Sequence, residues 1–379
     1  MGLVNLYRDF RTRRIPYASS LGTLANSDVV EDTPDILESE LQMTKRWQLG
    51  WLGFGLLSVR LAFAQATKPV ENIFQPSSTP AQSVFDLSML VLAICGAIFV
   101  IVTGLLVYTV FRFRHRAGDE TREPAQVYGS NQIEIAWTVL PILIVVVLTM
   151  ATARVINAVQ NKPMTADALQ VSVIGHQWWW EIRYPALGIV TANEVHVPVS
   201  SMLQSRLTFL RLESADVAHG FWVPKLAGKT DVIPGRKNSM WIEPKEEGVY
   251  LGNCSEYCGT QHANMLLSVV VESPEAFNRW AEAEKQQTPS AGNAAKFLAL
   301  SCVNCHTVSG TSAKGTFGPD LSHLMSRTTL ASGAIPNTPE NLRAWIRDPQ
   351  TIKPGNYMPN MQLNDTELDQ VVAYLATLK

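Results

Sequence analysis

The chain has 379 residues, 17% of them charged, and its formal net charge at pH 7 is −2. It is longer than an average single domain, and its charged fraction is below the roughly 25% of soluble globular proteins, so several domains and a membrane portion are expected. The lack of a basic excess excludes nucleic acid as a partner held through phosphate contacts.

The first 64 residues contain two different segments. Residues 1–42 are polar, with the acidic run EDTPD at 31–35, and are expected to be disordered or an extension that is not translated, with the start at Met43. Residues 43–64 have a basic start, a short apolar run and an Ala-Phe-Ala ending, which is typical of a signal peptide. A membrane anchor is the alternative, although Arg60 interrupts a run already shorter than the roughly 20 residues that span a bilayer.

Two apolar stretches, 84–111 and 136–153, are long enough to cross a membrane and predict a helical hairpin over 84–153. The loop between them begins with the basic run RFRHR at 112–116. Basic residues concentrate on the cytoplasmic side, so this loop is expected inside. The rest of the chain is then expected on the periplasmic or outer face of the inner (plasma) membrane.

Residues 165–272 consist of short β-type segments separated by Gly and Pro, which predicts an all-β sandwich. Strands are expected at 169–174, 194–197, 205–210 and 266–271. The loop before the last strand, 254–265, reads CSEYCGTQHANM, and an upstream loop carries His219.

These two loops together carry the ligand types of a metal site. They offer two thiolates, two imidazoles and the thioether of Met265. Sulfur ligands with imidazoles suit copper, and an axial Met tunes a copper electron carrier. Two thiolates in one loop can bridge a pair of metals. Structural zinc and a disulfide between Cys254 and Cys258 are the alternatives at this point, although zinc does not use the thioether.

The segment after the sandwich predicts a helix and linker at 273–292, with Ser273 as N-cap and Pro274 in the first turn. The run CVNCH at 302–306 then provides two thiols for covalent heme attachment and His306 as the iron ligand. The runs FGPDL at 317–321 and PGNYMP at 354–359 follow, and a terminal helix is expected at 365–378.

The copper-type loops resemble the CuA motif of cytochrome c oxidase subunit II at every ligand position. The resemblance implies a cupredoxin-like fold and a centre of two copper ions. It also implies that Glu256 contributes its backbone carbonyl, with its carboxylate reaching a magnesium ion at the interface with subunit I. The implied side-chain ligands are His219, Cys254, Cys258, His262 and Met265.

Two further segments resemble the same family. The run GHQWWWE at 175–181 is similar to its aromatic strand, in which Trp178 takes the position where electrons enter; ordinary core packing is the alternative. The run EIAWTVLP at 134–141 is similar to the start of its second span. Glu134 then corresponds to a carboxylate at the mouth of a proton channel in subunit I, with a solvated interfacial Glu as the alternative.

Residues 293–379 resemble a class I cytochrome c, an all-α domain. The resemblance implies that the Pro319 carbonyl accepts the proton of His306 and that Met358 is the distal heme ligand. Cys302 and Cys305 are the implied attachment points. Met361 lacks the Pro-Gly-x-x-Met pattern, and His323 is expected at the surface.

The resemblance covers 84–379 and implies a multi-domain membrane protein, subunit II of a caa-type oxidase. It implies transfer from an external donor, such as a cytochrome c or a quinol-oxidising complex, through heme c and CuA to heme a of subunit I. Dioxygen is then reduced to water with proton pumping, and subunit III is a further expected partner. The alternatives are a CuA-containing subunit of a nitric oxide reductase and a stand-alone membrane-tethered electron-transfer protein.

The predicted orientation can be tested by labelling. A reagent that reaches only periplasmic groups is expected to mark cysteines engineered near Thr79 and Lys162, but not one at Gly118, because the basic loop stays inside. Labelling at position 118 in intact cells would reverse the orientation and put the copper centre on the cytoplasmic side.

Overall fold

The computed structural model describes residues 72–114, 126, 128–201, 204–286 and 294–379. The predicted extension at 1–42, the signal peptide at 43–64, most of the loop between the spans and the linker segment 287–293 lie outside the described residues. All described residues belong to one compact unit, Val70–Lys379.

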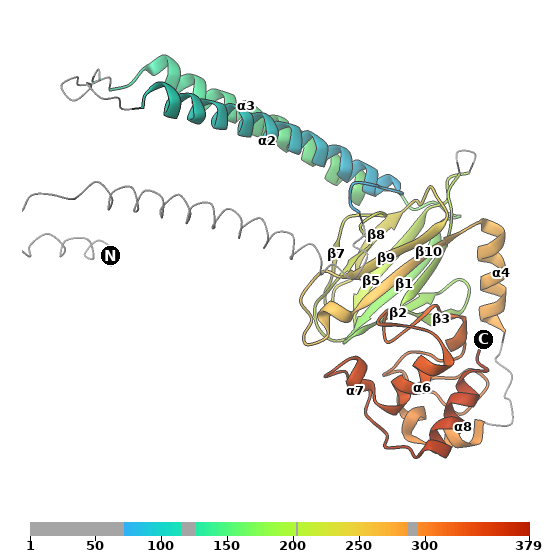
Figure 1. Ribbon diagram of the computed structural model, residues 1–379. Helices are drawn as coiled ribbons and strands as arrows, with labels where there is room; N and C mark the ends of the chain where they lie inside the picture. Colours follow the sequence, from blue (N-terminus) through green and yellow to red (C-terminus); the bar gives the residue numbers. More distant parts are fainter. Residues whose placement is uncertain (1–71, 115–125, 127, 202–203, 287–293) are drawn as a thin grey trace, which may run out of the picture. The chain divides into compact units, whose positions relative to one another are not determined.

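Two long helices, α2 (Thr79–Arg112) and α3 (Asn131–Gln160), form the predicted hairpin (Figure 1). Both are apolar enough to cross a membrane. Their 34 and 30 residues correspond to about 51 and 45 Å at 1.5 Å per residue, longer than the roughly 30 Å hydrocarbon core. They therefore begin before and end after the predicted spans, because a helix can continue beyond the apolar stretch.

The outer ends of the hairpin are attached to the strand domain. The Ser78 hydroxyl accepts a hydrogen bond from the Glu243 backbone N–H at 3.0 Å, and Thr79 Oγ1 donates to the Glu243 carboxylate at 2.5 Å. At the end of α3, Trp241 Nε1 donates to the Val159 carbonyl at 2.7 Å. These contacts tie both helices to the end of one strand and the residue after it.

The strand domain is a sandwich of two five-stranded sheets. The first has the order β3-β2-β1-β5-β8 and the second β4-β10-β9-β6-β7, with β1/β5 and β4/β10 parallel. Alternate residues of the strands face inward, and Val173, Ile182, Val195 and Val269 are fully buried between the sheets. The all-β prediction is confirmed. The strands are β1 (Leu169–His176), β2 (Trp179–Tyr184), β3 (Ile189–Ala192), β4 (Glu194–Pro198), β5 (Thr208–Ser214), β6 (His219–Trp222), β7 (Thr230–Val232), β8 (Asn238–Ile242), β9 (Gly248–Cys254) and β10 (Leu266–Glu272).

Helix α4 (Pro274–Lys285) leaves the sandwich directly after β10 and lies against it. Ser273 caps the helix as predicted, because its side chain accepts from the Ala276 N–H. Trp280 stacks on His196 at 4.2 Å between ring centroids. The helix is therefore part of the copper-type domain, and Lys285 marks the end of that domain's packing.

The C-terminal domain has short helices around its own apolar core, separate from the core of the sandwich. Phe297 and Tyr374 meet at its centre, with ring centroids 5.5 Å apart. An Asn364/Glu367 capping box starts the last helix, which ends at Leu375 rather than at the predicted residue 378. Its helices are α5 (Ala294–Ala299), η2 (Ser301–Asn304), η3 (Leu324–Ser326), α6 (Pro339–Arg347), α7 (Pro349–Ile352) and α8 (Asp365–Leu375), and its strand pair is β11 (Thr329–Leu330) with β12 (Ile335–Pro336).

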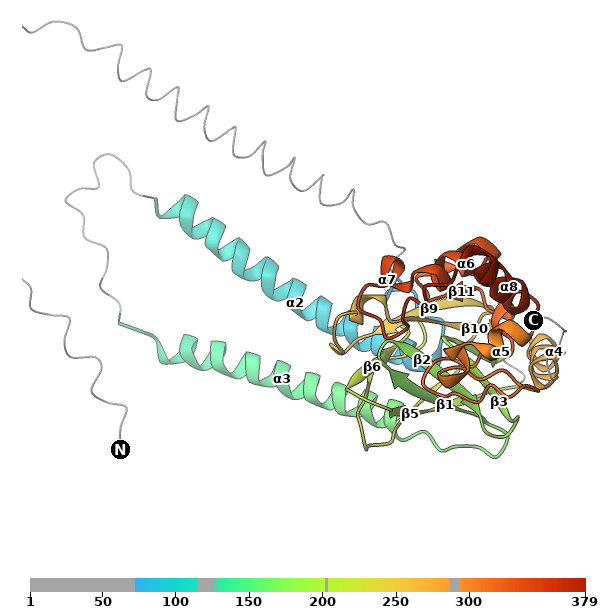
Figure 2. The same cartoon turned by 90° about the horizontal axis from the view of Figure 1, so that it is seen from below.

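In Figure 2, which is seen from below, these short helices are drawn in front of the strand domain.

Candidate functional site

The copper-type ligands come together because β6 and β9 are neighbours in one sheet. Phe221 of β6 pairs with Cys254 at the end of β9, so His219 lies beside the start of the loop 254–265, here called the Cys-rich loop. The loop closes on itself, since the Cys254 N–H donates to the Met265 carbonyl at 3.0 Å. Its short helix η1 (His262–Asn264) turns His262 back toward the two thiols.

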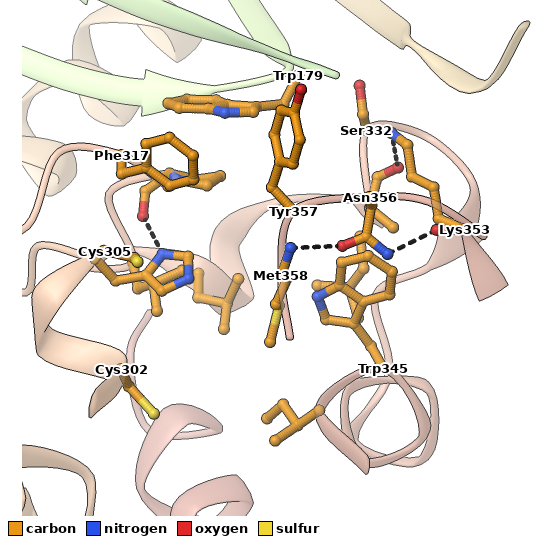
Figure 3. A pocket seen from close by; sticks show the side chains of 18 of the residues that line it. Trp179, Cys302, Cys305, Phe317, Ser332, Trp345, Lys353, Asn356, Tyr357 and Met358 are labelled. Carbon is orange, nitrogen blue, oxygen red and sulfur yellow. Dashed lines mark hydrogen bonds between the residues drawn. The ribbon is translucent and has the colours of Figure 1, made fainter. Parts of the chain in front are cut away.

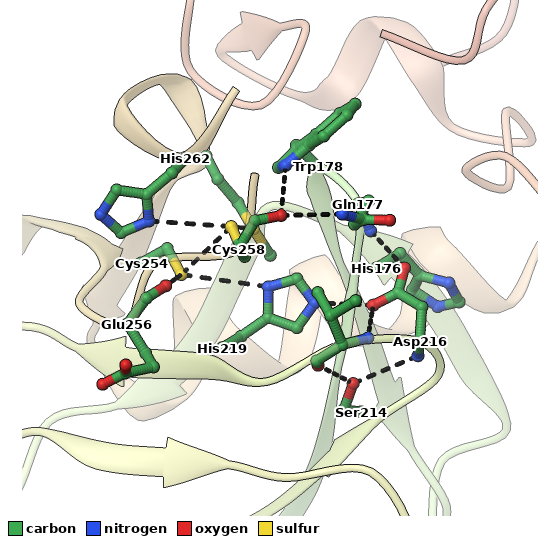
Figure 4. Close-up of polar contacts among 12 residues, drawn as sticks. His176, Gln177, Trp178, Ser214, Asp216, His219, Cys254, Glu256, Cys258 and His262 are labelled. Atoms are coloured by element: carbon green, nitrogen blue, oxygen red, sulfur yellow. Dashed lines mark hydrogen bonds and ion pairs between the residues drawn. The ribbon is translucent and has the colours of Figure 1, made fainter. Parts of the chain in front are cut away.

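The five predicted ligand side chains lie close together, and Figure 4 shows four of them, His219, Cys254, Cys258 and His262. The two cysteine sulfurs are 3.7 Å apart, and Nδ1 of His219 lies 3.9 Å from Cys254 Sγ. Nδ1 of His262 and Sδ of Met265 lie 3.7 and 3.8 Å from Cys258 Sγ. The Glu256 carbonyl is 3.1 Å from Cys254 Sγ. The arrangement can hold a pair of metal ions through bridging sulfurs.

The thiol pair itself favours a cation over a disulfide. Both cysteines are free thiols, and their sulfur separation of 3.7 Å is far above the roughly 2.0 Å of an S–S bond. A hydrogen bond from the Cys258 thiol lowers the pKa of Cys254 to about 3, and the same hydrogen bond to Cys254 raises the pKa of Cys258. Two adjacent thiolates therefore need positive charge between them, which fits a metal pair.

Asp216 orients the buried ligand His219. Its carboxylate lies 2.8 Å from His219 Nε2, which leaves Nδ1 turned toward Cys254. Burial of Asp216 opposes its ionisation, but hydrogen bonds from His219 and the Val217 and Gln177 backbone N–H groups lower its pKa overall. An ionised carboxylate behind a ligating imidazole fixes the ring and its tautomer. Asp216 stands three residues before His219, but no role was predicted for it from the sequence.

Two glycines leave room for the site. A Cβ on Gly175 would lie 2.7 Å from the His219 ring, and one on Gly220 would lie 2.9 Å from the Glu256 backbone nitrogen. Side chains at these positions would displace His219 or the Cys-rich loop. The local sequence is thus fitted to bring β1, β6 and the loop close together.

Trp178 lies directly beside the thiol site, in the turn between β1 and β2. Its Nε1 donates to the Cys258 carbonyl at 2.9 Å, and Gln177 Nε2 donates to the same oxygen at 2.8 Å. The indole is buried, with 7% of its surface exposed. By contrast, Trp179 stacks on His176 and Trp180 lies in the core, so the three tryptophans have different surroundings.

The two acidic residues that are expected to contact subunit I, Glu256 and Glu134, are both exposed. Glu256 extends from the Cys-rich loop, and Glu134 lies in the first turn of α3. Neither has an ion-pair partner among the described residues. Their carboxylates are available to another chain or an ion.

A cavity of about 310 Å³ is lined mainly by the C-terminal domain, and Gln177, Trp178, Trp179 and Asn193 of the sandwich complete its wall. Its walls include all four predicted heme-binding residues, and Figure 3 shows the labelled cysteines and Met358 around it. Most of the remaining wall is apolar, which suits a porphyrin. The predicted heme-binding residues are Cys302, Cys305, His306 and Met358.

The polar atoms of this cavity also fit a heme. His306 Nδ1 lies 2.8 Å from the Pro319 carbonyl, the contact that the resemblance implied. Burial lowers the pKa of His306, which favours the neutral ligating form. Arg327 is buried in the wall, and its Nε has no hydrogen-bond partner among the described residues. Such a guanidinium suits the carboxylates of a heme.

The other candidate ligands are placed as follows. Met361 lines the same cavity as Met358, so both thioethers lie near it. His323 does not line the cavity, but the prediction that it lies at the surface is wrong. The side chain is buried, and its Nδ1 lies 3.0 Å from the carbonyl oxygen of Lys379.

Two residues near the sites were not identified from the sequence. Lys353 is 3% exposed, and Tyr357, next to Met358, stacks on Trp178 with centroids 5.1 Å apart. Tyr357 directly precedes the predicted heme ligand Met358 in the run PGNYMP, and this position could have identified it as a site residue. Nothing in the sequence pattern marks Lys353.

Known proteins similar to this chain match its membrane, sandwich and C-terminal parts. Family models for cytochrome c oxidase subunit II match at 67–155 (transmembrane domain) and 169–273 (periplasmic domain), and a cytochrome c model matches at 291–379. The subunit 2 of Alkalihalophilus pseudofirmus is 34% identical over 82% of this chain and 92% of its own. That of Bacillus sp. (strain PS3) is 32% identical over 88% of this chain and 98% of its own.

Among solved structures, the periplasmic domain of subunit II of cytochrome oxidase of Bradyrhizobium japonicum is 30% identical, covering 32% of this chain and 96% of that one, with a TM-score of 0.30. The sequence relatives span nearly the whole described chain, including the segment that follows the sandwich. The chain therefore belongs to the cytochrome c oxidase subunit II family, in the form that carries a C-terminal cytochrome c domain, and is a membrane subunit of a heme-copper oxidase.

Proposed function

We propose that this chain carries electrons from an external donor, through its C-terminal domain and then its copper domain, to heme a of subunit I. There they reduce dioxygen to water with proton pumping. The donor is a cytochrome c or a quinol-oxidising complex, and subunit III is a further partner. The chain resides in the inner (plasma) membrane, with both electron-carrying domains on its outer face.

The copper domain is proposed to hold two copper ions through the cluster described above. Cys254 and Cys258 would supply two thiolates to them, His219 and His262 would supply imidazoles, and Met265 would supply a thioether. The Glu256 backbone carbonyl contributes a further contact, and its exposed carboxylate is available for a magnesium ion shared with subunit I. When bound, the copper pair accepts and releases one electron shared over both ions.

The C-terminal domain is proposed to hold heme c through thioether bonds to Cys302 and Cys305. His306 and Met358 bind the iron, and Pro319 fixes the His306 ring. When bound, the heme supplies one-electron redox chemistry at a potential that a Met ligand raises. The protein contributes a mostly apolar wall, and the buried Arg327 is available as a partner for the propionates.

The observation that carries the proposal is that two complete ligand sets lie on either side of one aromatic pair. Trp178 hydrogen-bonds to the carbonyl of Cys258 and stacks on Tyr357, the neighbour of Met358. This supports Trp178 as the residue where electrons enter the copper domain. Glu134, exposed near the start of α3, is proposed to lie at the mouth of a proton channel in subunit I.

The copper ligands predict distinct outcomes for sulfur substitutions. Cys254→Ser or Cys258→Ser is expected to abolish the shared two-copper state, because each removes a bridge. Met265→Leu is expected to keep both coppers and change their potential, since an axial ligand tunes the site. Metal analysis and electron paramagnetic resonance measure both effects. One zinc and no copper in the wild-type protein would overturn the assignment.

The two thioethers at the heme cavity give a matched pair of variants. Met358→Ala is expected to lower the heme potential and to open the iron to exogenous ligands, because a Met ligand favours a high potential. Met361→Ala is expected to change neither. Redox titration and ligand-binding spectra distinguish them, and the reverse result would move the ligand assignment to Met361.

Removing the heme domain tests the route as a whole. A chain ending at about Lys285 is expected to bind copper and assemble, because the sandwich has its own core and α4 is intact. Turnover with the natural donor is expected to fall by about a hundredfold, because a tethered donor acts at an effective concentration of order millimolar. If the truncated oxidase accepted electrons as fast as the complete one, the heme would lie outside the route.

A further inference from the structure

The C-terminal domain is held on the copper domain by a specific surface, in addition to the covalent linker. The Leu266 N–H, directly after Met265, donates to the Ser332 carbonyl at 3.1 Å, and Ser332 Oγ donates back to the Leu266 carbonyl at 2.8 Å. Gly333 has a φ of +80°, and a Cβ there would lie 2.8 Å from Leu266 Cβ. The turn between β11 and β12 thus packs closely on the end of the Cys-rich loop.

A buried carboxylate forms a second part of this surface. Glu194 of β4 is only 2% exposed, and its Oε1 accepts hydrogen bonds from the Thr328 N–H and hydroxyl at 2.7 and 2.5 Å. The Thr329 N–H lies 3.3 Å from the same oxygen. A buried charge is tolerated only where such donors satisfy it. The C-terminal domain supplies these donors from one short segment.

Lys353 lies at the centre of the surface, nearest to the two sites. Its Nζ donates to the carbonyls of Trp178 at 2.7 Å, Asn264 at 2.9 Å and Ala331 at 3.1 Å. These three acceptors match the three N–H donors of an ammonium group. No carboxylate pairs with Lys353 in the part of the chain that the structure describes. Its position therefore depends on carbonyls from both domains.

The carbonyls that Lys353 binds belong to functional segments. Trp178 is the tryptophan beside the thiols, and Asn264 precedes the ligand Met265. Four residues after Lys353 stands Tyr357, whose ring stacks on Trp178 and whose hydroxyl donates to Gln177 Oε1 at 2.9 Å. Phe317, which also lines the heme cavity, lies 6.0 Å from the Tyr357 ring. Lys353 thus fixes the segment that places Tyr357 against Trp178, and both rings line the heme cavity.

We propose that Lys353 is a positioning residue that locks the heme domain onto the copper domain, so that Tyr357 covers Trp178 and bridges the heme cavity to the copper site. The inference rests on the proposed function. Because Trp178 is covered by the chain's own Tyr357, an external donor delivers its electrons to the heme domain and not to the copper domain directly.

The test uses the complete oxidase with Lys353→Met, which keeps an unbranched side chain without the charge. Transfer from heme to copper is measured by absorbance after a photoexcited reductant injects one electron. We expect the rate to fall about tenfold or more, because it scales with the fraction of molecules in the docked state. Hydrogen exchange at the Leu266 amide is expected to accelerate, since its acceptor Ser332 belongs to the other domain.

Lys296→Met is the matched control. It removes a lysine of the same domain that pairs with Glu367 within that domain, and it should change neither measurement. A Lys353→Met oxidase with wild-type transfer, or with slower transfer but unchanged exchange at Leu266, would overturn the positioning role. If the wild-type chain passed no electron from heme to copper, the proposed function itself would fail, which is a separate result.

A second pair of variants tests the bridge without altering Lys353. Tyr357→Phe keeps the ring on Trp178 and loses only the hydrogen bond to Gln177, so transfer is expected to stay near the wild-type rate. Tyr357→Leu removes the ring, and transfer is expected to fall severalfold with the heme potential and the Leu266 exchange unchanged. Equal rates in the two variants would exclude Tyr357 as the bridge, even if Lys353→Met did not assemble.

Discussion

Two thiols in a closed loop, with sulfurs 3.7 Å apart, cannot both ionise unless a positive charge lies between them. Several neighbouring segments bring other ligand side chains to these two sulfurs. The β6/β9 pairing brings His219 to one sulfur, and η1 brings His262 to the other. Asp216 fixes the His219 ring, and small residues at 175 and 220 let the segments approach. The sandwich is the frame that keeps these ligands in place.

The loop that carries the two thiols also contacts the C-terminal domain. The Cys-rich loop ends at Met265, and the next residue, Leu266, is hydrogen-bonded to the turn between β11 and β12. Lys353 donates to the carbonyl of Asn264 within that loop and to the carbonyl of Trp178 in the turn between β1 and β2. The two domains have separate cores, so each can fold around its own apolar residues. Their contact combines hydrogen bonds with the stacked rings of Trp178 and Tyr357, which suits a surface that sets a distance between two redox sites.

The sequence was sufficient where the chemistry is local. The thiols, His262 and Met265 all lie within one loop, and CVNCH is a continuous run, so the sequence indicated a metal site and a heme site, and the resemblance to the CuA motif implied copper. The hairpin and the sandwich followed from apolar length and from alternating strand residues, because these patterns depend on the burial of neighbouring positions. The helix starts at Ser273 and Asn364 were equally local, since a cap bonds to a backbone N–H three residues on.

Only the tertiary structure decided how the sites are supported and joined. His323 was misplaced because its partner is the backbone carbonyl of the chain's last residue. Lys353 binds three backbone carbonyls, and Glu194 is satisfied mainly through the segment at 328–329, far along the chain. Backbone carbonyls and N–H groups occur at almost every position, so a side chain that depends on them leaves no spacing pattern to read. The sequence by itself thus determined the folds of this protein and indicated its candidate ligands, whereas the packing of the two domains decided which residues connect them.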